Sequence, residues 1–316
     1  MSEAPKHEPV MVEEVVDLFR PVPPGPLVDA TVGLGGHGRA LLAALDHIRL
    51  IGLDQDGDAL AAAAGALSGF EGRVALHRAR FDDLSTITKE EGRLSGALFD
   101  LGVSSLQLDR AERGFSYRAD GPLDMRQDQR RPTTAADIVN TYDEGRLAQV
   151  LHDYGDERYA RRISHAIVRA RPLARTTHLA EVVRNAIPAP ARRHGGDPAR
   201  RTFQALRLEV NKELDVLGPA LDQALDGLAP GGRCVVLAYH SGEDRIVKER
   251  FRTASTGGCT CPPRLPCVCG ASPKFGLVMR GARRPTSIEV ARNHRAESAR
   301  LRAIERLADP EPEDAA

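Results

Sequence analysis

The segment from Leu27 to Gly38 limits the possible folds of this chain more than any other stretch. It reads LVDATVGLGGHG, an apolar run typical of a buried strand and then a glycine-rich turn, and the helix-favouring run RALLAAL follows directly. Strand, glycine turn and helix predict the first unit of a doubly wound nucleotide-binding sheet. The spacing of Gly33, Gly35 and Gly38 also fits G-x-G-x-x-G. That spacing alone leaves NAD, FAD and S-adenosylmethionine open as ligands.

Acidic residues at strand ends narrow the choice of ligand. Asp54 follows the apolar run RLIGL, and Asp100 follows GALF. An acid after the second strand can accept hydrogen bonds from ribose hydroxyls, and the carboxyl ends of parallel strands face one ligand site. Asp29 stands inside the first strand, where it would repel a pyrophosphate but help to neutralise a sulfonium. We therefore favour a methyl donor over a dinucleotide; the alternative is that Asp29 only caps the turn.

Composition excludes several classes of protein. The 44 basic and 44 acidic residues cancel, so overall charge gives no argument for a nucleic-acid partner. Five cysteines in 316 residues do not form a disulfide scaffold. No apolar run approaches membrane-spanning length, so we expect a soluble, cytoplasmic protein with no membrane partner.

A helical insertion is predicted between the fourth strand and the buried strand of 228–238. Helical patterns cover 144–152, 158–171, 178–187 and 201–228, after an irregular stretch, 110–139, that we expect to form a structured wall of the active site. Residues 158–207 carry twelve arginines and only two acids. A helix face that is merely exposed to solvent usually carries charges of both signs. We therefore interpret this stretch as a surface that binds the phosphate backbone of a nucleic acid.

The predicted fold class is therefore α/β, a Rossmann-like sheet with an inserted helical domain. We expect residues 1–110 and 215–308 to form the sheet domain and 111–214 to form the substrate-recognition insertion. A helix is predicted over 289–307, and 309–316 should be a disordered acidic tail.

Two features remain ambiguous from the residues alone. Phe81, after the third strand, either lies against an adenine ring or fills the core. Four cysteines, at 259, 261, 267 and 269, either bind zinc or stay as reduced thiols. The C-x-C spacing is tighter than that of a usual zinc knuckle, so we assign no metal ligands.

Several strings in the chain are similar to motifs of a known family. They are HEPV (7–10), DATVGLGGHG (29–38), DLGVSSLQLD (100–109), GFSYR (114–118), GPLDMR (121–126), YGDERYARR (154–162), RTFQALR (201–207), HSGEDRIVK (240–248) and SARLR (298–302). With these strings the chain resembles the bacterial 16S ribosomal RNA cytosine-N4 methyltransferase family, the ribosomal RNA small subunit methyltransferase H family. The resemblance spans nearly the whole chain. It departs from the family pattern at Gly242, where leucine is usual, and at His294, where the pattern has proline.

The resemblance implies a class I S-adenosylmethionine-dependent methyltransferase that acts on 16S rRNA in the small ribosomal subunit. It implies cofactor contacts by Gly35, Gly36, His37, Asp54, Phe81, Asp100 and Gln107. As catalytic residues we predict Asp100, with Ser104 and Ser105 nearby, because a hydrogen-bond acceptor would take the proton of the cytosine amine. As substrate-binding residues we predict Arg161, Arg162, Arg201, His240, Ser241, Asp244 and Arg245.

Two rival functions are kept open. One is a non-catalytic ribosome-assembly factor that retains the cofactor fold as a scaffold, and the strand-end acids weigh against it. The other is a methyltransferase for protein or small molecules, and the basic insertion weighs against that. The oligomeric state is left open.

Overall fold

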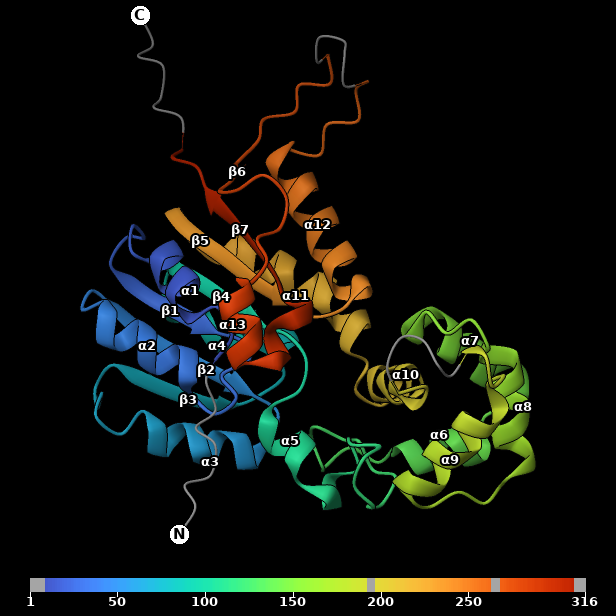
Figure 1. Cartoon of the computed structure of the whole chain (residues 1–316). Coiled ribbons are helices and arrows are strands. Elements are labelled where there is room, and N and C mark those ends of the chain that lie inside the picture. The colour runs from blue at the N-terminus through green and yellow to red at the C-terminus, as the bar shows by residue number, and fades with distance from the viewer. Residues whose placement is uncertain (1–8, 192–196, 263–267, 310–316) are drawn as a thin grey trace, which may run out of the picture. The chain divides into compact units, whose positions relative to one another are not determined.

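The computed structural model describes residues 9–191, 197–262 and 268–309 (Figure 1). The chain divides into two units, one up to Gly102 and from Val216 onward, the other from Val103 to Asp215. The first boundary lies before Ser104, whereas we expected residues up to 110 in the sheet domain. The predicted acidic tail lies outside the described residues except for Asp309, whose carboxylate pairs with Arg306.

The first unit is built on a seven-stranded sheet in the order β3-β2-β1-β4-β5-β7-β6. Neighbouring strands from β3 to β5 pair in parallel, and β7 runs antiparallel to both β5 and β6. The predicted Rossmann-like α/β class is therefore confirmed. The strands are β1 Gly25–Asp29, β2 Ile48–Asp54, β3 Val74–Arg78, β4 Leu94–Asp100, β5 Leu228–Ala238, β6 Phe275–Leu277 and β7 Arg300–Arg306.

Helices cover both faces of this sheet. Apolar side chains of the strands point alternately to the two faces and so contribute to an apolar core on each of them. Leu27 packs in one buried cluster and its neighbour Val28 in the other, because successive strand residues point to opposite faces. Cys234 is buried in the second cluster, as expected of a small core residue. The first face carries α1 Val12–Phe19, α2 Gly36–Ala44 and α3 Gly57–Ala66; the second carries α4 Leu84–Thr88, α11 Glu213–Gly227 and α12 Ser241–Ser255.

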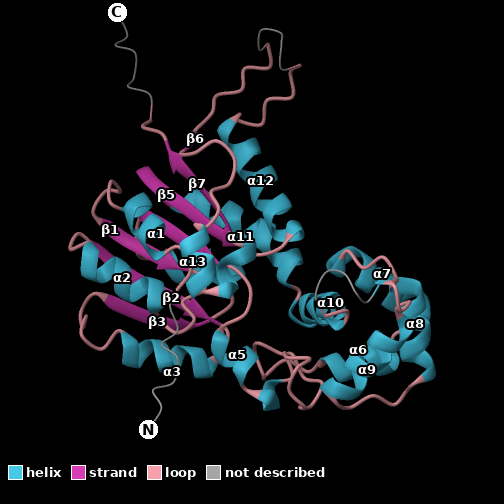
Figure 2. Cartoon of the chain, in the orientation of Figure 1, coloured by secondary structure: helices cyan, strands magenta, loops and turns pink. Residues whose placement is uncertain are grey.

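The second unit consists of helices and loops around a separate apolar core (Figure 2). Its helices are α5 Ser105–Asp109, α6 Ala135–Thr141, α7 Glu144–Gly155, α8 Ala160–Arg169, α9 Thr176–Ala186 and α10 Ala199–Asn211. Within the described residues of either unit, no helix has the length and apolar character needed to cross a membrane.

The irregular stretch before α6 is ordered, as predicted. Leu123 and Met125 are buried in the helical core. A Cβ on Gly114 would lie 2.1 Å from the carbonyl oxygen of Pro122, and one on Gly121 would lie 1.8 Å from that of Ala111. Only glycine allows such close backbone contacts. The role of this stretch as an active-site wall stays a prediction.

The helix predicted over 201–228 is wrong, because the chain breaks it at Lys212. This residue has φ 56° and separates α10 from α11. Asn211 explains the break: its side chain accepts a hydrogen bond from the Gln127 amide (2.8 Å) and donates one to the Met125 carbonyl (2.8 Å). These long-range contacts fix the end of α10. The next residue, Lys212, adopts the left-handed conformation that commonly ends a helix.

The helix predicted over 289–307 is also wrong. Only Ser287–Arg292 forms a helix, α13, and after a short 3-10 turn the chain enters the sheet as β7 between β5 and β6. Leu301 and Ala303 alternate with arginines and are buried against the sheet's first core. The sequence RLRAIER has the alternating pattern of a half-buried strand. Here this pattern determines the structure in spite of the helix propensity of the residues.

Candidate active site

The glycine loop between β1 and α2 is held by the acid that ends β2. Oδ2 of Asp54 accepts a hydrogen bond from the Gly33 backbone amide at 3.0 Å, and Oδ1 accepts one from the Asp56 backbone amide at 2.9 Å. Gly33 and Gly35 have φ of 52° and 80°, which favours glycine at both positions. Asp54 therefore ties the loop after β1 to the loop after β2, and its remaining lone pairs can still accept from a ribose diol.

Two buried acids at this edge of the sheet, Asp29 and Asp54, have raised pKa values, although the charge of His37 partly offsets the effect of burial on Asp29. Burial raises the pKa of Asp29 to about 7 and the pKa of Asp54 to about 6. Asp29 is 1% exposed, and its Oδ1 accepts a hydrogen bond from the Thr31 amide at 3.2 Å. The turn-capping role is thus present. Because the pKa values of both acids are raised, a bound cation would stabilise their ionised carboxylates.

Asp100, at the end of β4, is held by three neighbours. Its Oδ1 accepts a 2.6 Å hydrogen bond from the Tyr239 hydroxyl, and its Oδ2 lies 3.4 Å from Nδ1 of His37. Its backbone amide donates to the Thr31 hydroxyl at 2.7 Å. About a quarter of the side chain (26%) is still exposed. The carboxylate is therefore fixed in orientation but remains accessible to a ligand.

The buried ring of His37 links this carboxylate to the N-terminal segment. Nε2 lies 2.9 Å from the Val10 carbonyl, which can only accept, so Nε2 carries a proton. Burial lowers the pKa of His37, but the hydrogen bond and charge of Asp100 outweigh this and raise it overall. The imidazolium form satisfies both neighbours, since it donates at both nitrogens.

Gly35 and Gly36 have packing reasons for being glycine. A Cβ on Gly36 would lie 2.4 Å from Cγ of Pro9, and one on Gly35 would lie 3.2 Å from Cα of Ala63. The first contact brings the segment before α1 directly onto the glycine loop. The predicted cofactor contacts of both glycines stay a prediction.

Phe81 lies in a short 3-10 turn after β3 and packs edge-to-face on Phe99, with ring centroids 6.0 Å apart. It joins the second core as a partly buried member. The core-filling alternative therefore has direct support. The side chain is half-buried, so contact with an adenine ring remains a prediction for its other face.

Sequence reasoning missed Tyr239, the residue that fixes Asp100. Tyr239 directly follows β5, so the rule that located the strand-end acids also applied to it. Its side chain is partly buried beside the Asp100 carboxylate; burial and then the charge of Asp100 raise its pKa well above the usual value. It therefore stays protonated and acts as a permanent donor.

His240 and Asp244, which are predicted substrate-binding residues, also have partners within the protein. Nδ1 of His240 accepts from the Gly242 and Glu243 amides at the start of α12, and Nε2 lies 2.9 Å from Oε1 of Glu243. Asp244 forms ion pairs with Arg300 (2.8 Å) and Arg302 (2.7 Å). Although burial opposes it, these arginines lower the pKa of Asp244. Their predicted contacts with substrate stay a prediction.

Ser241 and Arg245 remain candidates. Both are exposed in α12, and residues four apart lie on the same helix face.

Three of the predicted catalytic and cofactor-binding residues lie in the second unit. Ser104 caps α5: its hydroxyl accepts from the Gln107 amide at 3.3 Å, and the Gln107 side chain accepts from the Ser104 amide at 3.2 Å. Gln107 and Ser105 are buried. The predicted cofactor role of Gln107 and catalytic roles of Ser104 and Ser105 stay predictions.

Two of the predicted substrate-binding arginines, Arg161 and Arg162, line a cavity in the second unit. A cavity of about 820 Å³ lies between α7 and α8, and Arg158, Arg161 and Arg162 line it together with Tyr159 and His152. All three arginines are exposed, and within the described residues they form no ion pair. Glu144, Asp153 and Glu157 also line the cavity, so its charge is mixed.

Other arginines of the basic stretch are engaged inside the unit. Arg192 and Arg193 lie outside the described residues. Arg201 is exposed and donates to the Asp156 carbonyl at 3.0 Å, which leaves part of its guanidinium available. Structural partners hold Arg171 (carbonyls of Val139 and Tyr142), Arg175 (Asp120), Arg184 (Asp197) and Arg207 (Glu213).

Comparisons with known proteins identify the family of this chain. The sequence matches the MraW methylase family over residues 4–307. Proteins named ribosomal RNA small subunit methyltransferase H are 52% identical in Frankia alni (97% of each chain) and 52% identical in Thermobifida fusca (98% of this chain, 96% of that one). One from Heliobacterium modesticaldum is 48% identical over 95% of this chain and 98% of its own. The chain therefore belongs to the MraW methylase family.

Proposed function

We propose that this protein transfers a methyl group from S-adenosylmethionine to the N4 amine of a cytidine in 16S rRNA of the small ribosomal subunit. The observation that carries the proposal is the fixed Asp100 carboxylate beside the glycine loop of a methylase-family sheet. The names of the relatives supply the substrate class. Such a substrate implies a cytoplasmic location.

The residues at the sheet edge fit this donor. Asp29 and Asp54 have pKa values raised by burial, so a cationic ligand would be favourable there. Asp54 is placed for a ribose diol, and the amides at the start of α2 suit a carboxylate. When bound, S-adenosylmethionine supplies an electrophilic methyl group on a positively charged sulfur.

Asp100 is proposed as the acceptor for the amine proton. The lone pair of a cytosine amine is delocalised into the ring, so a carboxylate that hydrogen-bonds the amine favours a nucleophilic nitrogen and takes the released proton. Tyr239 and His37 hold the carboxylate, which keeps its orientation and limits reorganisation. Tyr239 and His37 are positioning residues in this proposal.

The RNA contact is proposed for the cavity between α7 and α8. Its exposed arginines, Arg158, Arg161 and Arg162, can bind phosphate oxygens, and Tyr159 offers a ring for stacking. A target base must be outside a helical stack for its amine to be reached, so single-stranded or splayed RNA is the expected form of the substrate.

The test identifies the methylated nucleoside. The protein is incubated with methyl-labelled S-adenosylmethionine and one of three acceptors: small subunits lacking the modification, naked 16S rRNA, or a protein fraction without RNA. After digestion, we expect label in N4-methylcytidine from the subunits. Label in another nucleoside would refute the acceptor atom, and label in protein would favour the rival methyltransferase. Binding of the cofactor without any label would favour the scaffold role.

A further inference from the structure

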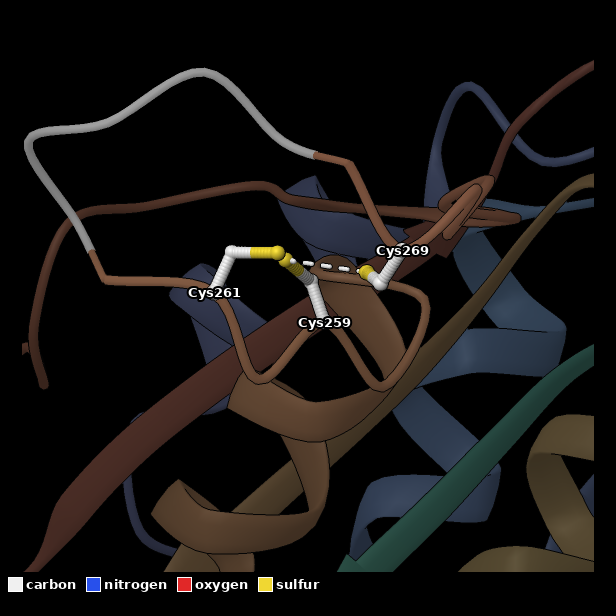
Figure 3. A group of neighbouring side chains, drawn as sticks. All are labelled: Cys259, Cys261 and Cys269. Atoms are coloured by element: carbon white, nitrogen blue, oxygen red, sulfur yellow. Dashed lines mark hydrogen bonds between the residues drawn. The ribbon is translucent and has the colours of Figure 1, made fainter.

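Three cysteine side chains converge in the first unit, in the segment between α12 and β6. The Sγ atoms of Cys259, Cys261 and Cys269 all lie within 4.8 Å of one another (Figure 3). The Sγ atoms of Cys259 and Cys269 are 3.5 Å apart. A fourth cysteine of the sequence, Cys267, lies outside the described residues.

These separations match the spacing of thiolates around one metal ion. In a tetrahedral zinc site with Zn–S bonds of about 2.3 Å, two sulfurs are about 3.8 Å apart. A disulfide does not explain the arrangement, because its S–S length is about 2.05 Å and it would join only two of the three sulfurs. Several irons bridged in a cluster would hold the thiolates farther apart than a single ion does.

The backbone is folded so that it brings the cysteines together. Gly257 and Gly258, with φ of 60° and 75°, turn the chain directly before Cys259. The Cys259 amide then donates to the Thr256 carbonyl at 3.1 Å. A Cβ on Gly257 would lie 2.7 Å from the carbonyl carbon and oxygen of Ser272, so the two arms of the segment touch at this point. Glycine is needed for that approach.

This segment has no apolar core of its own. Between Phe251 and Phe275, none of the described residues is buried, and Val268 is 88% exposed. Burial of side chains therefore does not account for a defined conformation here. Segments without a core are commonly held by a metal or a disulfide, and the geometry above disfavours the disulfide.

We propose that Cys259, Cys261 and Cys269 bind one zinc ion as thiolates and that this ion fixes the segment after α12. Soft thiolate ligands select zinc over magnesium or calcium, and zinc needs no redox partner. Binding releases the thiol protons, so zinc affinity falls at low pH. The role is structural, since the site consists of thiolates in an exposed segment.

The test measures metal in the whole protein, purified without metal-affinity tags. We expect about one zinc per chain, released when a mercurial reagent blocks the thiols. Cobalt added to metal-free protein should give the absorption bands of a tetrahedral thiolate site. The triple variant Cys259→Ser, Cys261→Ser, Cys269→Ser should lose both signals, whereas Cys234→Ala, a cysteine in the core of the sheet, should keep them. Cys267→Ser reports whether that residue supplies a further ligand.

Several results would overturn the proposal. These are iron in place of zinc, zinc retained by the triple variant, or metal-free wild-type protein whose cobalt complex shows no thiolate bands. A local readout separates the site from global folding: removal of zinc should increase proteolysis between residues 255 and 275 several-fold while S-adenosylmethionine binding is unchanged. Equal proteolysis with and without zinc would exclude the stabilising role.

Discussion

The Tyr239 hydroxyl donates a 2.6 Å hydrogen bond to the Asp100 carboxylate, and this contact joins the ends of two neighbouring strands, β5 and β4. Because the pKa of Tyr239 is raised well above its usual value by burial and by Asp100, the hydroxyl remains a donor at every working pH. The orientation of the proposed proton acceptor thus depends on a residue that need not touch substrate.

Replacing Tyr239 with phenylalanine should lower kcat about 10- to 100-fold, since a hydrogen bond to a charged group contributes about 1.5–3 kcal/mol. The KM for RNA should change little, because the variant alters the orientation of Asp100 and not the arginines. Steady-state kinetics with both substrates tests this. Tyr142→Phe is the control: its hydroxyl donates to Glu209 at 2.7 Å in the second unit. Equal losses of kcat in both variants would contradict the positioning role.

The affinity for S-adenosylmethionine should rise with pH up to about pH 7. The pKa of Asp29 is raised to about 7, so at lower pH a cationic ligand must displace its proton, at a cost of up to about tenfold in affinity per pH unit. Calorimetric titration of the protein with S-adenosylmethionine between pH 5.5 and 8 measures this slope. Asp29→Asn should flatten the slope between about pH 6 and 7, whereas Asp54, with a pKa of about 6, should still contribute below that range. A slope unchanged in the variant would assign the effect to another group.

The same raised pKa predicts how the stability of the cofactor-free protein depends on pH. The folded state keeps a proton on Asp29 up to about pH 7, whereas the unfolded state releases it near 3.8. Stability from this group is therefore complete below about pH 4 and is lost as pH rises to about 7. In urea unfolding, wild type should lose stability relative to Asp29→Asn across this range. A constant difference would show that Asp29 is ionised in the folded state.

The double variant Arg161→Gln, Arg162→Gln should weaken RNA binding and reduce its salt dependence. Each lost phosphate contact lowers the slope of log affinity against log salt by about 0.7 for single strands. Titration of RNA at several salt concentrations measures this slope. The control is Arg20→Gln, an exposed arginine of the first unit paired with Asp17. If the slope is the same in both variants, the α7–α8 cavity does not hold phosphates.

Leu301→Ala should cost about 2–5 kcal/mol of unfolding free energy in the first unit, because this fully buried side chain faces the core from β7. Leu307→Ala, at a position 41% exposed just after β7, should cost less than about 1 kcal/mol. Chemical denaturation compares the two. Similar costs at both positions would contradict a strand that points Leu301 inward.

The strand-end acids could be predicted from the sequence because they follow short apolar runs, and the edge of a parallel sheet then brings them together. Asp29, Asp54 and Asp100 were found in this way. Tyr239 follows β5 just as directly, but a neutral hydroxyl carries no charge that marks it in the sequence as the partner of a strand-end acid. The glycines were predictable as a turn, but their contacts with Pro9 and Ala63 were not.

The two incorrect helices have different physical causes. The break at Lys212 depends on contacts of Asn211 with residues more than 80 positions away, which local propensity does not contain. The segment of β7 combines helix-favouring residues with an alternating pattern. Hydrogen bonding to both β5 and β6 favours the strand over the helix, and these contacts exist only in the folded sheet.

The most direct test of the account compares wild type with Asp100→Asn in a single-turnover assay on small subunits lacking the modification. Asparagine keeps the shape and can still accept from Tyr239, but it cannot take a proton from the amine. Wild type should form N4-methylcytidine, and the variant should bind S-adenosylmethionine yet form it at least about 100-fold more slowly. Normal turnover by Asp100→Asn, or wild-type product in a different nucleoside, would contradict the account.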